Sequence, residues 1–431
     1  MTDNVAMAAS PQHPAESDAH ATWAERLLHP RYALRVFCAA LLIVYALVPL
    51  GVYATSLERT EHLTLALITV LAVAAMVMGS KFPYFDKQMK RSSTRLVVDQ
   101  TAFIAVTWTV FLLFVLVTVV TAPSIPIVSA LQGADPNTLS EERGDFLKRR
   151  EGAGIALLYI STFLVNTVVP YTLVLLYARQ ARLRHAAAAT FFMYCISFMQ
   201  KALFLNLVLP LLVLLAIRSR LRGKTLSLAL VFSTVVLFGA TALSVADGPD
   251  ASSQPGNYLS AQYEPTGPLD YFIWRAVAVP TFTATDSLVV HRDQFGGHSL
   301  HGATSNLLSW IFNLERVNIE RFVFEHQFGS WNEIANANAV FTTDAYVNFG
   351  WLGVVVFGIA VGMLFRLFRR SDDVGIESLW PLFAFSLFSG PFIGTLLSNG
   401  FIYVVFHALF VRVKPAQRRR LTPDANDTAC P

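Results

Sequence analysis

The side chains best suited to chemistry gather between residues 270 and 351. A single arginine, Arg275, interrupts the apolar run YFIWRAVAVP. A polar stretch follows around two glycines that permit a tight turn, and it holds His291, Arg292, Asp293, His298 and His301. Arginine can hold a diphosphate through two parallel hydrogen bonds, and histidine or aspartate can take a proton from an attacking hydroxyl. Anion binding and acid–base chemistry are therefore the two activities to which these residue types point.

Each of these groups also has a plainer interpretation. The segment LDYFIWRAVAVPTFTATDSLVVH is amphipathic, so Arg275 could instead reach phospholipid headgroups from a helix lying in the membrane interface. Three histidines and an aspartate could bind a metal ion, but their spacing matches no zinc motif, and we expect no metal. An acid–base or anion-binding role and a solvated loop remain as alternatives for the histidine stretch.

The next stretch, FNLERVNIERFVFEHQFGSWNEIANANA, carries opposite charges four and five residues apart. On a helix such charges pair across turns, so a salt-bridged helix face explains them without catalysis. Across residues 246–345, however, eleven acidic residues accompany four arginines and no lysine. Cations supplied by arginine alone suit recognition of planar phosphate groups, and here they are Arg275, Arg292, Arg316 and Arg321.

The polar run NANAVFTTDAYVNFGWLG continues without a break into an apolar stretch from Trp351 to Leu367 that is long enough to enter a bilayer. An aromatic belt of Tyr346, Phe349 and Trp351 at the membrane surface, with asparagines that cap the helix, is the ordinary explanation of such a pattern.

The elements that must position these residues are membrane helices. The chain of 431 residues is 54% hydrophobic and 14% charged, with a mean hydropathy of +0.49. Its apolar blocks have the length of helices that cross about 30 Å of hydrocarbon. They lie near residues 33–54, 63–80, 101–121, 154–178, 186–217, 225–245, 346–368, 379–397 and 400–413. The three cysteines, two of them inside these blocks, predict neither a disulfide nor a zinc site.

Basic residues set the expected orientation. Six clusters of lysine and arginine flank the blocks, and the positive-inside rule places all six in the cytoplasm. A single crossing by 186–217 would put its flanking clusters on opposite sides, so we split it into two short helices. Lys201 then lies in the turn between them, where it either serves function or caps the turn at the outer surface. The sequence thus predicts an all-α polytopic integral membrane protein with about ten transmembrane helices.

The expected organisation has five parts. A polar cytoplasmic segment at 1–32, without the apolar core of a cleaved signal, precedes transmembrane helices 1–7 at 33–245. One large outer loop follows at 246–345, and transmembrane helices 8–10 at 346–413 lead to a cytoplasmic tail at 414–431. The outer loop is the largest extramembrane segment, which makes it the first place to look for function.

Several motifs in and after this loop are those of one bacterial family. The run FTTDAYVNFGWLGVVVFGIAVG combines Asn-Phe-Gly with Gly353, Gly358 and Gly362 on the following span. With YFIWRAVAVP and FGGHSLHG upstream, it resembles the oligosaccharide repeat-unit polymerases, the Wzy-type O-antigen polymerases, in order and spacing. One dominant loop before the last three spans is similar too. The resemblance covers residues 270–365, and the N-terminal half is similar only as a series of spans.

The resemblance implies a GT-C-like layout in the bacterial inner membrane, with both termini cytoplasmic and the large loop periplasmic. It implies an inverting glycosyl transfer that needs neither metal nor cofactor. The donor is a glycan on undecaprenyl diphosphate, and the acceptor is a sugar hydroxyl of another lipid-linked repeat unit. The product is O-antigen, capsule or exopolysaccharide. Membrane lipids and a chain-length regulator are the further expected partners, and nucleic acid is not one.

Site roles follow from the resemblance and from the demands of that reaction. Arginines stabilise the leaving diphosphate, and a carboxylate or histidine takes the acceptor proton. The catalytic candidates are Arg275, His291, Asp293, His301 and Asp344. The substrate-binding candidates are Lys201, Arg292, Arg316, Arg321, Asn338, Thr342, Tyr346, Asn348 and Trp351, and the last five of these form the lip of a cavity. The glycines of the span are expected to serve close helix packing.

Two other functions stay open from the sequence. An O-antigen ligase-type glycosyltransferase uses the same donor and leaving group, and its loop arginine and histidine elements are similar to Arg275 and to His291 or His301. A transporter or flippase for lipid-linked oligosaccharide would share the hydrophobicity. It would also place several polar residues within several spans, whereas here Lys201 is nearly alone.

Overall fold

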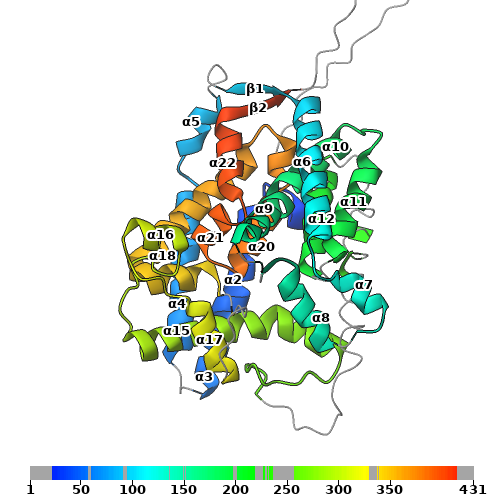
Figure 1. The fold of residues 1–431 in the computed structure, drawn as a ribbon. Coiled ribbons are helices and arrows are strands. Elements are labelled where there is room, and N and C mark those ends of the chain that lie inside the picture. The colour runs from blue at the N-terminus through cyan, green and yellow to red at the C-terminus, as the bar shows by residue number, and fades with distance from the viewer. Residues whose placement is uncertain are drawn as a thin grey trace, which may run out of the picture.

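The fold was analysed in a computed structural model that describes residues 22–56, 60–90, 95–134, 136–148, 150, 152–197, 201–218, 227, 228, 231, 233–235, 257–329, 337 and 339–414. These residues are helical apart from loops and one small sheet (Figure 1). In the sheet, β1 (Leu96–Asp99) pairs in parallel with β2 (Val411–Lys414), with Leu96 opposite Val411. The predicted all-α class is therefore confirmed, with a two-stranded sheet added.

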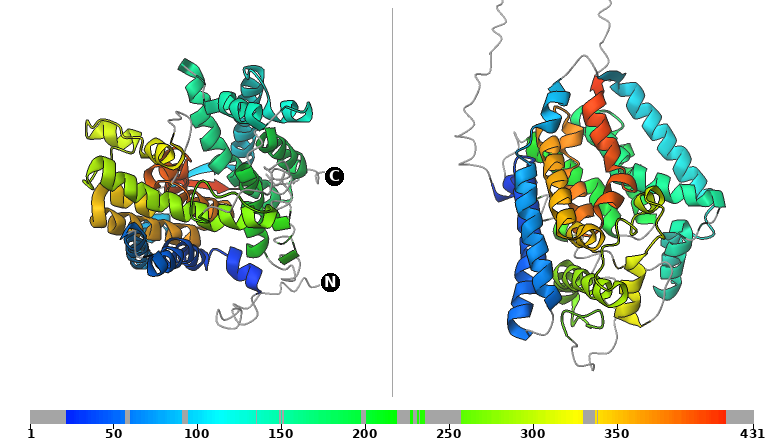
Figure 2. Two further views of the ribbon diagram at one scale, coloured as in Figure 1. Left: turned by 90° about the horizontal axis from the view of Figure 1, so that it is seen from below. Right: turned by 90° about the vertical axis from the view of Figure 1, so that its left-hand side faces the viewer.

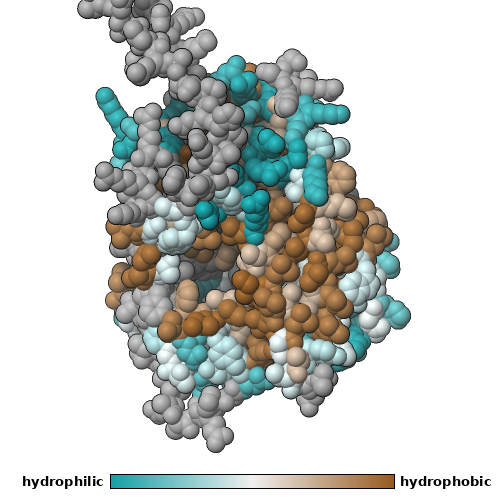
Figure 3. Space-filling model, turned by 180° about the vertical axis from the view of Figure 1, so that it is seen from behind, coloured by the Kyte–Doolittle hydropathy of each residue, from teal (hydrophilic) through white to brown (hydrophobic). Residues whose placement is uncertain are grey.

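Five helical stretches are long and apolar enough to cross a membrane, namely Ala33–Thr55, Thr60–Met89, Gln100–Val120, Ile155–Ala178 and Phe341–Arg370. They coincide with the apolar blocks predicted near 33–54, 63–80, 101–121, 154–178 and 346–368. Figure 3 shows a broad apolar band across one face of the molecule, with polar surface above and below it. The chain is accordingly a multi-pass membrane protein.

Three of these long stretches contain more than one element. The first comprises α2 (Ala33–Leu42), the π-helical turn η1 (Ile43–Leu47) and α3 (Val48–Ser56). The second joins α4 (Thr60–Gly79) to α5 (Tyr84–Lys90), and the third is α6 (Gln100–Val120). The fourth comprises α9 (Ile155–Phe163), the π-helical turn η5 (Leu164–Val168) and α10 (Val169–Ala178), and the fifth is α18 (Phe341–Arg370).

Shorter helices fill the remaining predicted blocks. The block 186–217 contains α11 (Arg184–Ser197) and α12 (Lys201–Ile217), so the predicted division into two helices is confirmed. The last two blocks contain α20 (Trp380–Phe388), α21 (Phe392–Leu397) and α22 (Phe401–Phe410), preceded by the short α19 (Val374–Glu377). Other short helices are α1 (Trp23–Leu28), α7 (Pro126–Leu131) and α8 (Pro136–Arg143). Most of the block 225–245 lies outside the described residues.

The most extensive contact among the described helices joins α4 to α18, which run side by side (Figure 2). Small residues permit it: a methyl group built on Gly362 would overlap the carbonyl oxygen of Met76, and one on Gly358 would lie 2.7 Å from Cβ of Ala75. In a membrane, helices associate through close packing of this kind because lipid supplies no hydrophobic drive between them. The predicted packing role is confirmed for Gly358 and Gly362, whereas a methyl group on Gly353 would meet Ala345 and Phe349 of α18 itself.

The bundle has one strongly basic end, called here the basic end. Arg366, Arg369 and Arg370 lie there at the close of α18. Arg366 forms a two-pronged ion pair with Asp86 of α5, at 3.0 Å from Nε to Oδ1 and 2.5 Å from Nη2 to Oδ2. The sheet lies at the same end, because α5, β1 and β2 are neighbours at the top of Figure 1.

The segment 257–329 lies away from the basic end and contains most of the predicted site. It forms α14 (Pro268–Ile273), the π-helical turn η6 (Trp274–Ala278), α15 (Val279–Phe295), α16 (Asn306–Ile311) and α17 (Ile319–Phe328). Helix α15 crosses the lower part of Figure 1, where it packs on α4, α17 and α18. Every side chain from Thr281 to His291 is buried. The predicted amphipathic interfacial helix is therefore wrong for residues 281–291, which protein covers on all sides, whereas Arg275 in η6 is exposed.

We predict that Gly362→Ala destabilises the protein although alanine favours a helix by about 0.5–1 kcal/mol. The added methyl group overlaps the backbone of α4 and forces the two helices apart, which costs about 1–3 kcal/mol. The melting temperature of the purified protein in detergent should fall by several degrees. Gly51→Ala is the matched control, because a methyl group on Gly51 of α3 meets no atom within 4 Å. Equal melting temperatures for the two variants would contradict the packing role.

Candidate functional site

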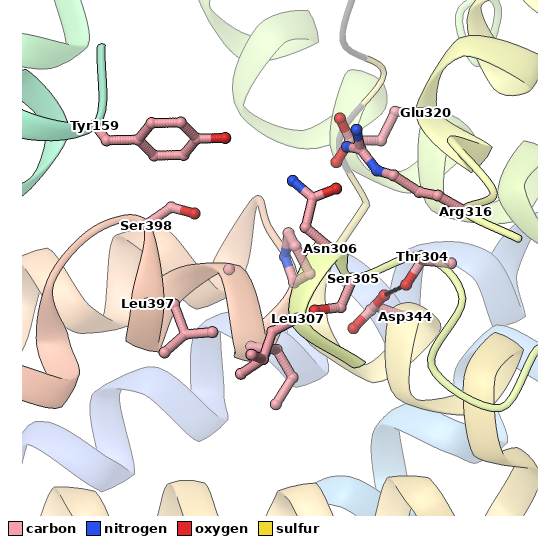
Figure 4. Close-up of a pocket in the computed structure, with 13 residues that line it drawn as sticks. Tyr159, Thr304, Ser305, Asn306, Leu307, Arg316, Glu320, Asp344, Leu397 and Ser398 are labelled. Carbon is pink, nitrogen blue, oxygen red and sulfur yellow. Dashed lines mark hydrogen bonds between the residues drawn. The ribbon is translucent and has the colours of Figure 1, made fainter. Parts of the chain in front are cut away.

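A cavity of about 390 Å³ lies between the segment 257–329 and the membrane helices (Figure 4). We call it the Asp344 cavity. Its walls come from residues 304–307, from Arg316 and Glu320, from Asp344 of α18, from α21 and the residues flanking it, and from Tyr159 of α9. The volume falls within the range of about 300–1,000 Å³ that is common for small-molecule sites. The lining combines a carboxylate, a guanidinium and hydroxyl and amide groups with an apolar wall, a suitable composition for a charged sugar ligand.

Asp344 is held by two neighbours in a defined orientation. Its Oδ1 accepts a hydrogen bond from Thr304 Oγ1 at 3.0 Å and another from Asn348 Nδ2 at 2.9 Å. Asn348 is buried one turn further along the helix, and it also donates to Thr304 Oγ1 at 2.7 Å. Among the described residues no hydrogen bond reaches Oδ2 of Asp344. The carboxylate therefore has one oxygen fixed by the protein and one available to a ligand.

A break in α18 brings the loop onto this helix. Gly350 has φ 61° and ψ −155°, which is non-helical and open only to glycine. The break releases backbone carbonyls just before it: Val347 O accepts from Leu300 N at 3.1 Å, and Asn348 O accepts from His301 N at 2.8 Å. The side chain of Asn348 adds a bond from Gly302 N to its Oδ1 at 3.1 Å. Residues 300–304 are thereby docked on α18 beside the cavity.

Arg316 and Glu320 lie at another edge of the cavity, near the start of α17 (Figure 4). Arg316 precedes the helix, so the predicted salt-bridged helix face contains only Glu320, Arg321 and Glu325 of the original pattern. The side chain of Arg316 is exposed and forms no ion pair with any residue that the structure describes. It is the cation of the cavity wall, and its guanidinium is placed to meet an anionic group of a ligand.

Several predicted catalytic residues lie outside this cavity. Arg275 is exposed in η6 and does not line it. Arg292 forms ion pairs with Glu61 of α4 and with Asp293, the latter at 2.7 Å, so this pair ties α15 to the bundle. His291 is buried, and its Nε2 lies 2.8 Å from the carbonyl oxygen of His298. A carbonyl oxygen can only accept a hydrogen bond, so Nε2 carries the proton. The imidazole of His291 therefore joins α15 to the turn that contains His298.

The other predicted residues also lie away from the cavity lining or outside the described residues. The side chain of His301 is exposed, while its backbone at φ 51° forms part of the docked loop. Tyr346 packs edge-on between His291 and Trp351, and Trp351 is 46% exposed, as an aromatic belt would require. Thr342 is fully buried, and Arg321 lies in α17 away from the cavity lining. Asn338 and the side chain of Lys201 lie outside the described residues.

The capping alternative for the asparagines is wrong for Asn348. The helix α18 begins after Val340, which supplies no side-chain cap, and Asn348 lies inside the helix with its side chain turned toward the loop. The sequence analysis missed Thr304, Asn306, Glu320, Tyr159 and Ser398 as cavity residues. The four-residue spacing of Asp344 and Asn348, which places both on one helix face, was the available signal.

The described part of the chain contains no group of three or more histidine, cysteine or carboxylate side chains that could hold a metal ion. The histidines of the stretch 291–301 differ in burial: His291 is buried, and the side chains of His298 and His301 are exposed.

The spans contain more polar residues than the sequence analysis recognised. Asn206 Nδ2 donates to Asn166 Oδ1 at 2.8 Å, and Asn166 Nδ2 donates to Asn399 Oδ1 at 3.0 Å. Closer to the basic end, Tyr171 donates to Asp373 at 2.6 Å and lies 3.0 Å from Nε2 of His407. The prediction that Lys201 is nearly alone among intramembrane polar residues is therefore wrong. The sequence does not reveal these side chains because they pair with one another between helices and form no charge pattern.

We predict that Asn348→Ala loosens the loop 299–304 without unfolding the bundle. The change removes the side-chain bonds to Gly302, Thr304 and Asp344, and it leaves a buried N–H without a partner, at a cost of about 1–3 kcal/mol. Hydrogen exchange measured by mass spectrometry should accelerate in this loop and stay unchanged in α4. Asn306→Ala, at an exposed cavity position, is the control. Unchanged exchange of the loop in Asn348→Ala would contradict the docking role.

Comparison of the chain with protein-family models, with curated proteins and with solved structures finds no match. The resemblance to the repeat-unit polymerases therefore stays a prediction from the sequence motifs, and the geometry of the Asp344 cavity is the independent observation to set beside it.

Proposed function

We propose that the protein is a polymerase that joins undecaprenyl-diphosphate-linked oligosaccharide repeat units by inverting glycosyl transfer in the Asp344 cavity. The observation that carries the proposal is the pairing, in one cavity at the membrane, of a carboxylate with one open oxygen and a guanidinium without an ion-pair partner among the described residues. An inverting transfer from a lipid diphosphate needs a base for the acceptor and a cation for the leaving group.

The proposed orientation follows from the basic end. Cytoplasmic loops of membrane proteins are enriched in lysine and arginine, so the end with Arg366, Arg369 and Arg370 faces the cytoplasm. Asp344 is near the opposite end of α18, and the segment 257–329 beside it is then periplasmic. The finer proposal is about ten spans in a GT-C-like layout, with both termini cytoplasmic in a bacterial inner membrane. Short helices such as α11, α12, α20 and α22 supply the additional spans.

The proposed chemistry is a single displacement. An acceptor hydroxyl oxygen attacks the anomeric carbon of the donor sugar while the bond from that carbon to the diphosphate oxygen breaks. Asp344 Oδ2 takes the hydroxyl proton, and Thr304 and Asn348 hold the other carboxylate oxygen so that Oδ2 faces the cavity. Arg316 stabilises the negative charge that develops on the departing diphosphate. Asp344 takes part only in this proton transfer, and a carboxylate held in a fixed position can accept the proton without moving.

The amphiphilic substrate fits the location of the cavity. Its polar wall comes from the loop 304–307 and α17, and its apolar wall comes from Ile393 and Leu397 of α21. Sugars and diphosphate would lie against the former while the polyprenyl chain leaves toward the bilayer beside the latter. Arg275 is exposed elsewhere on the same segment, so we assign the leaving group to Arg316 instead of Arg275.

A second candidate, transport of the lipid-linked oligosaccharide, is favoured by the polar side chains between η5, α12 and the link from α21 to α22. Intramembrane polar residues are typical of substrate and proton pathways. Asn166, Asn206 and Asn399 occupy such a position in this bundle. The ligase alternative uses the same cavity chemistry and differs only in the acceptor.

We predict that Asp344→Asn and Arg316→Ala each lower polymer formation about 100-fold or more, because one loses the base and the other loses the leaving-group cation. Arg316→Lys should restore only part of the activity, since an ammonium group cannot form the two-pronged contact. Each variant is expressed in a host deleted for the gene, and surface polysaccharide and lipid-linked glycans are resolved on a gel. Membrane levels are checked in parallel, and Glu315→Gln, outside the cavity, is the control.

The gel separates the candidate functions. Single repeat units without a ladder in the deletion strain support the polymerase. Long polymer retained on the lipid carrier supports a ligase, and repeat units trapped at the cytoplasmic face support transport; either result overturns the proposal. Wild-type ladders from both Asp344→Asn and Arg316→Ala would remove the Asp344 cavity from the reaction.

A further inference from the structure

Part of the Asp344 cavity has no role in the reaction proposed above. Tyr159 of α9 and Ser398, which follows α21, lie on the side of the cavity opposite Arg316, and Asn306, the first residue of α16, lies between the two sides (Figure 4). We call Tyr159, Ser398 and Asn306 the Tyr159 wall. Three segments far apart in the sequence thus meet in the same space as Asp344.

The side chains of the Tyr159 wall are open to a ligand. Tyr159 is 51% exposed, and Ser398 and Asn306 are exposed as well. Within the described part of the chain, no hydrogen bond involves any of these three side chains. The phenol ring of Tyr159 points into the cavity (Figure 4). A flat aromatic face beside hydroxyl and amide groups suits a sugar ring, whose C–H face can pack on the aromatic ring while its hydroxyls form hydrogen bonds.

The link from α21 to α22, which carries Ser398, is held by the π-helical turn η5. Thr167 Oγ1 donates to the carbonyl oxygen of Asn399, and Asn166 Nδ2 donates to Asn399 Oδ1 at 3.0 Å. Asn206 of α12 holds Asn166 in turn, at 2.8 Å from Nδ2 to Oδ1. Single π-helical turns inside α-helices are frequent at functional sites. Here the turn fixes the backbone next to Ser398.

The same face of α9 carries Tyr159 and packs on this link. Phe163 follows Tyr159 by one helical turn, so the two side chains lie on one face of the helix. Gly400 has φ 80°, and a methyl group built on it would lie 2.6 Å from the ring of Phe163. The close approach of Phe163 to Gly400 keeps Tyr159 beside Ser398. A wall fixed in this way binds a ligand without first paying to order itself.

The charges of the cavity lining lie away from Tyr159 and Ser398. The charged side chains of the lining are Arg316, Glu320 and Asp344, which are one guanidinium and two carboxylates. The side chains of the Tyr159 wall are uncharged. A sugar carboxylate bound there would lose water without gaining a cation, whereas an uncharged sugar exchanges water for neutral hydroxyl and amide groups.

We propose that the Tyr159 wall binds an uncharged sugar ring of the acceptor, stacked on Tyr159 and hydrogen-bonded to Ser398 and Asn306. The assignment of this ring to the acceptor rests on the function proposed above. In an inverting displacement the attacking oxygen approaches from the side opposite the leaving group. Arg316 stabilises the leaving diphosphate, so the acceptor lies on the side of Tyr159.

The test uses a probe that carries the sugars without the diphosphate. Mild acid releases this oligosaccharide from the lipid-linked glycans of the strain deleted for the gene. The purified full chain in a neutral detergent is titrated with it by isothermal titration calorimetry. We expect Tyr159→Ala to bind about tenfold more weakly and Tyr159→Phe to stay within about threefold of the wild type, because phenylalanine keeps the stacking ring. Tyr84→Ala is the matched control, because Tyr84 is 72% exposed on α5, outside the cavity.

A second variant and a second measurement make the test specific. Tyr159→Leu fills the space without a flat ring, so it should bind as weakly as Tyr159→Ala, and wild-type binding by it would overturn the stacking. Saturation-transfer NMR identifies the sugar that the protein contacts. Transfer should be strongest to an uncharged ring and should be lost in Tyr159→Ala. Strongest transfer to a ring that bears a carboxylate would overturn the proposal.

The outcomes separate this inference from the proposed function. Single repeat units in the deletion strain, together with equal oligosaccharide binding by Tyr159→Ala and Tyr84→Ala, would support the polymerase and overturn the sugar site. A ligase or transporter pattern in the deletion strain, together with weak binding by Tyr159→Ala, would keep the sugar site and overturn both its assignment to the acceptor and the proposed function.

Discussion

The break in α18 at Gly350 is the constraint on which the Asp344 cavity depends. An unbroken helix would use the carbonyls of Val347 and Asn348 within its own ladder and leave none for a loop. With the break, those carbonyls accept from residues 300 and 301, and the loop reaches α18 at the level of Asp344. Thr304 then bonds the carboxylate directly. Gly350 thus sets the position of the Asp344 side chain, six residues earlier, through a backbone conformation that only glycine adopts readily.

The second half of α18 supplies the fixed wall for this arrangement. Gly358 and Gly362 pack against the backbone of α4, and Arg366 joins the far end of α18 to Asp86. The first half, residues 341–349, is held by the loop and by α15. The two halves share one partner, because Phe37 of α2 stacks on Phe341 of the first half and on Phe365 of the second, and Gly350 is the point where their directions differ.

The sequence predicts the membrane helices well, because a span must be continuously apolar over about 20 residues and leaves little room for ambiguity. It also predicts the packing of Gly358 and Gly362, and it selects Asp344 and Asn348 as candidates, which lie in contact in the structure. It does not predict the surroundings of Arg292 and His291, whose residue types suggest chemistry. Their partners, Glu61 and the carbonyl of His298, are found only in the folded chain. The aromatic and amide pairs inside the spans, such as Tyr171 with His407, escape prediction because they carry no charge pattern.

A buried polar group serves structure when all its hydrogen-bonding atoms have protein partners, and it can bind a ligand when one of them has none. Between α10 and α22, Tyr403 donates to His407 Nδ1, His407 Nε2 donates to Tyr171, and Tyr171 donates to Asp373. This chain is consistent with a neutral imidazole, and each ring nitrogen has a protein partner. Such closure stabilises helix association and leaves no group aimed at a passing ligand. Asp344 differs, because its Oδ1 accepts two hydrogen bonds while its Oδ2 faces a cavity that Arg316 also lines. A ligand could complete an acceptor that is left open at a cavity with a guanidinium at its edge, and this is why we propose a function for the Asp344 cavity instead of for the polar pairs along the spans.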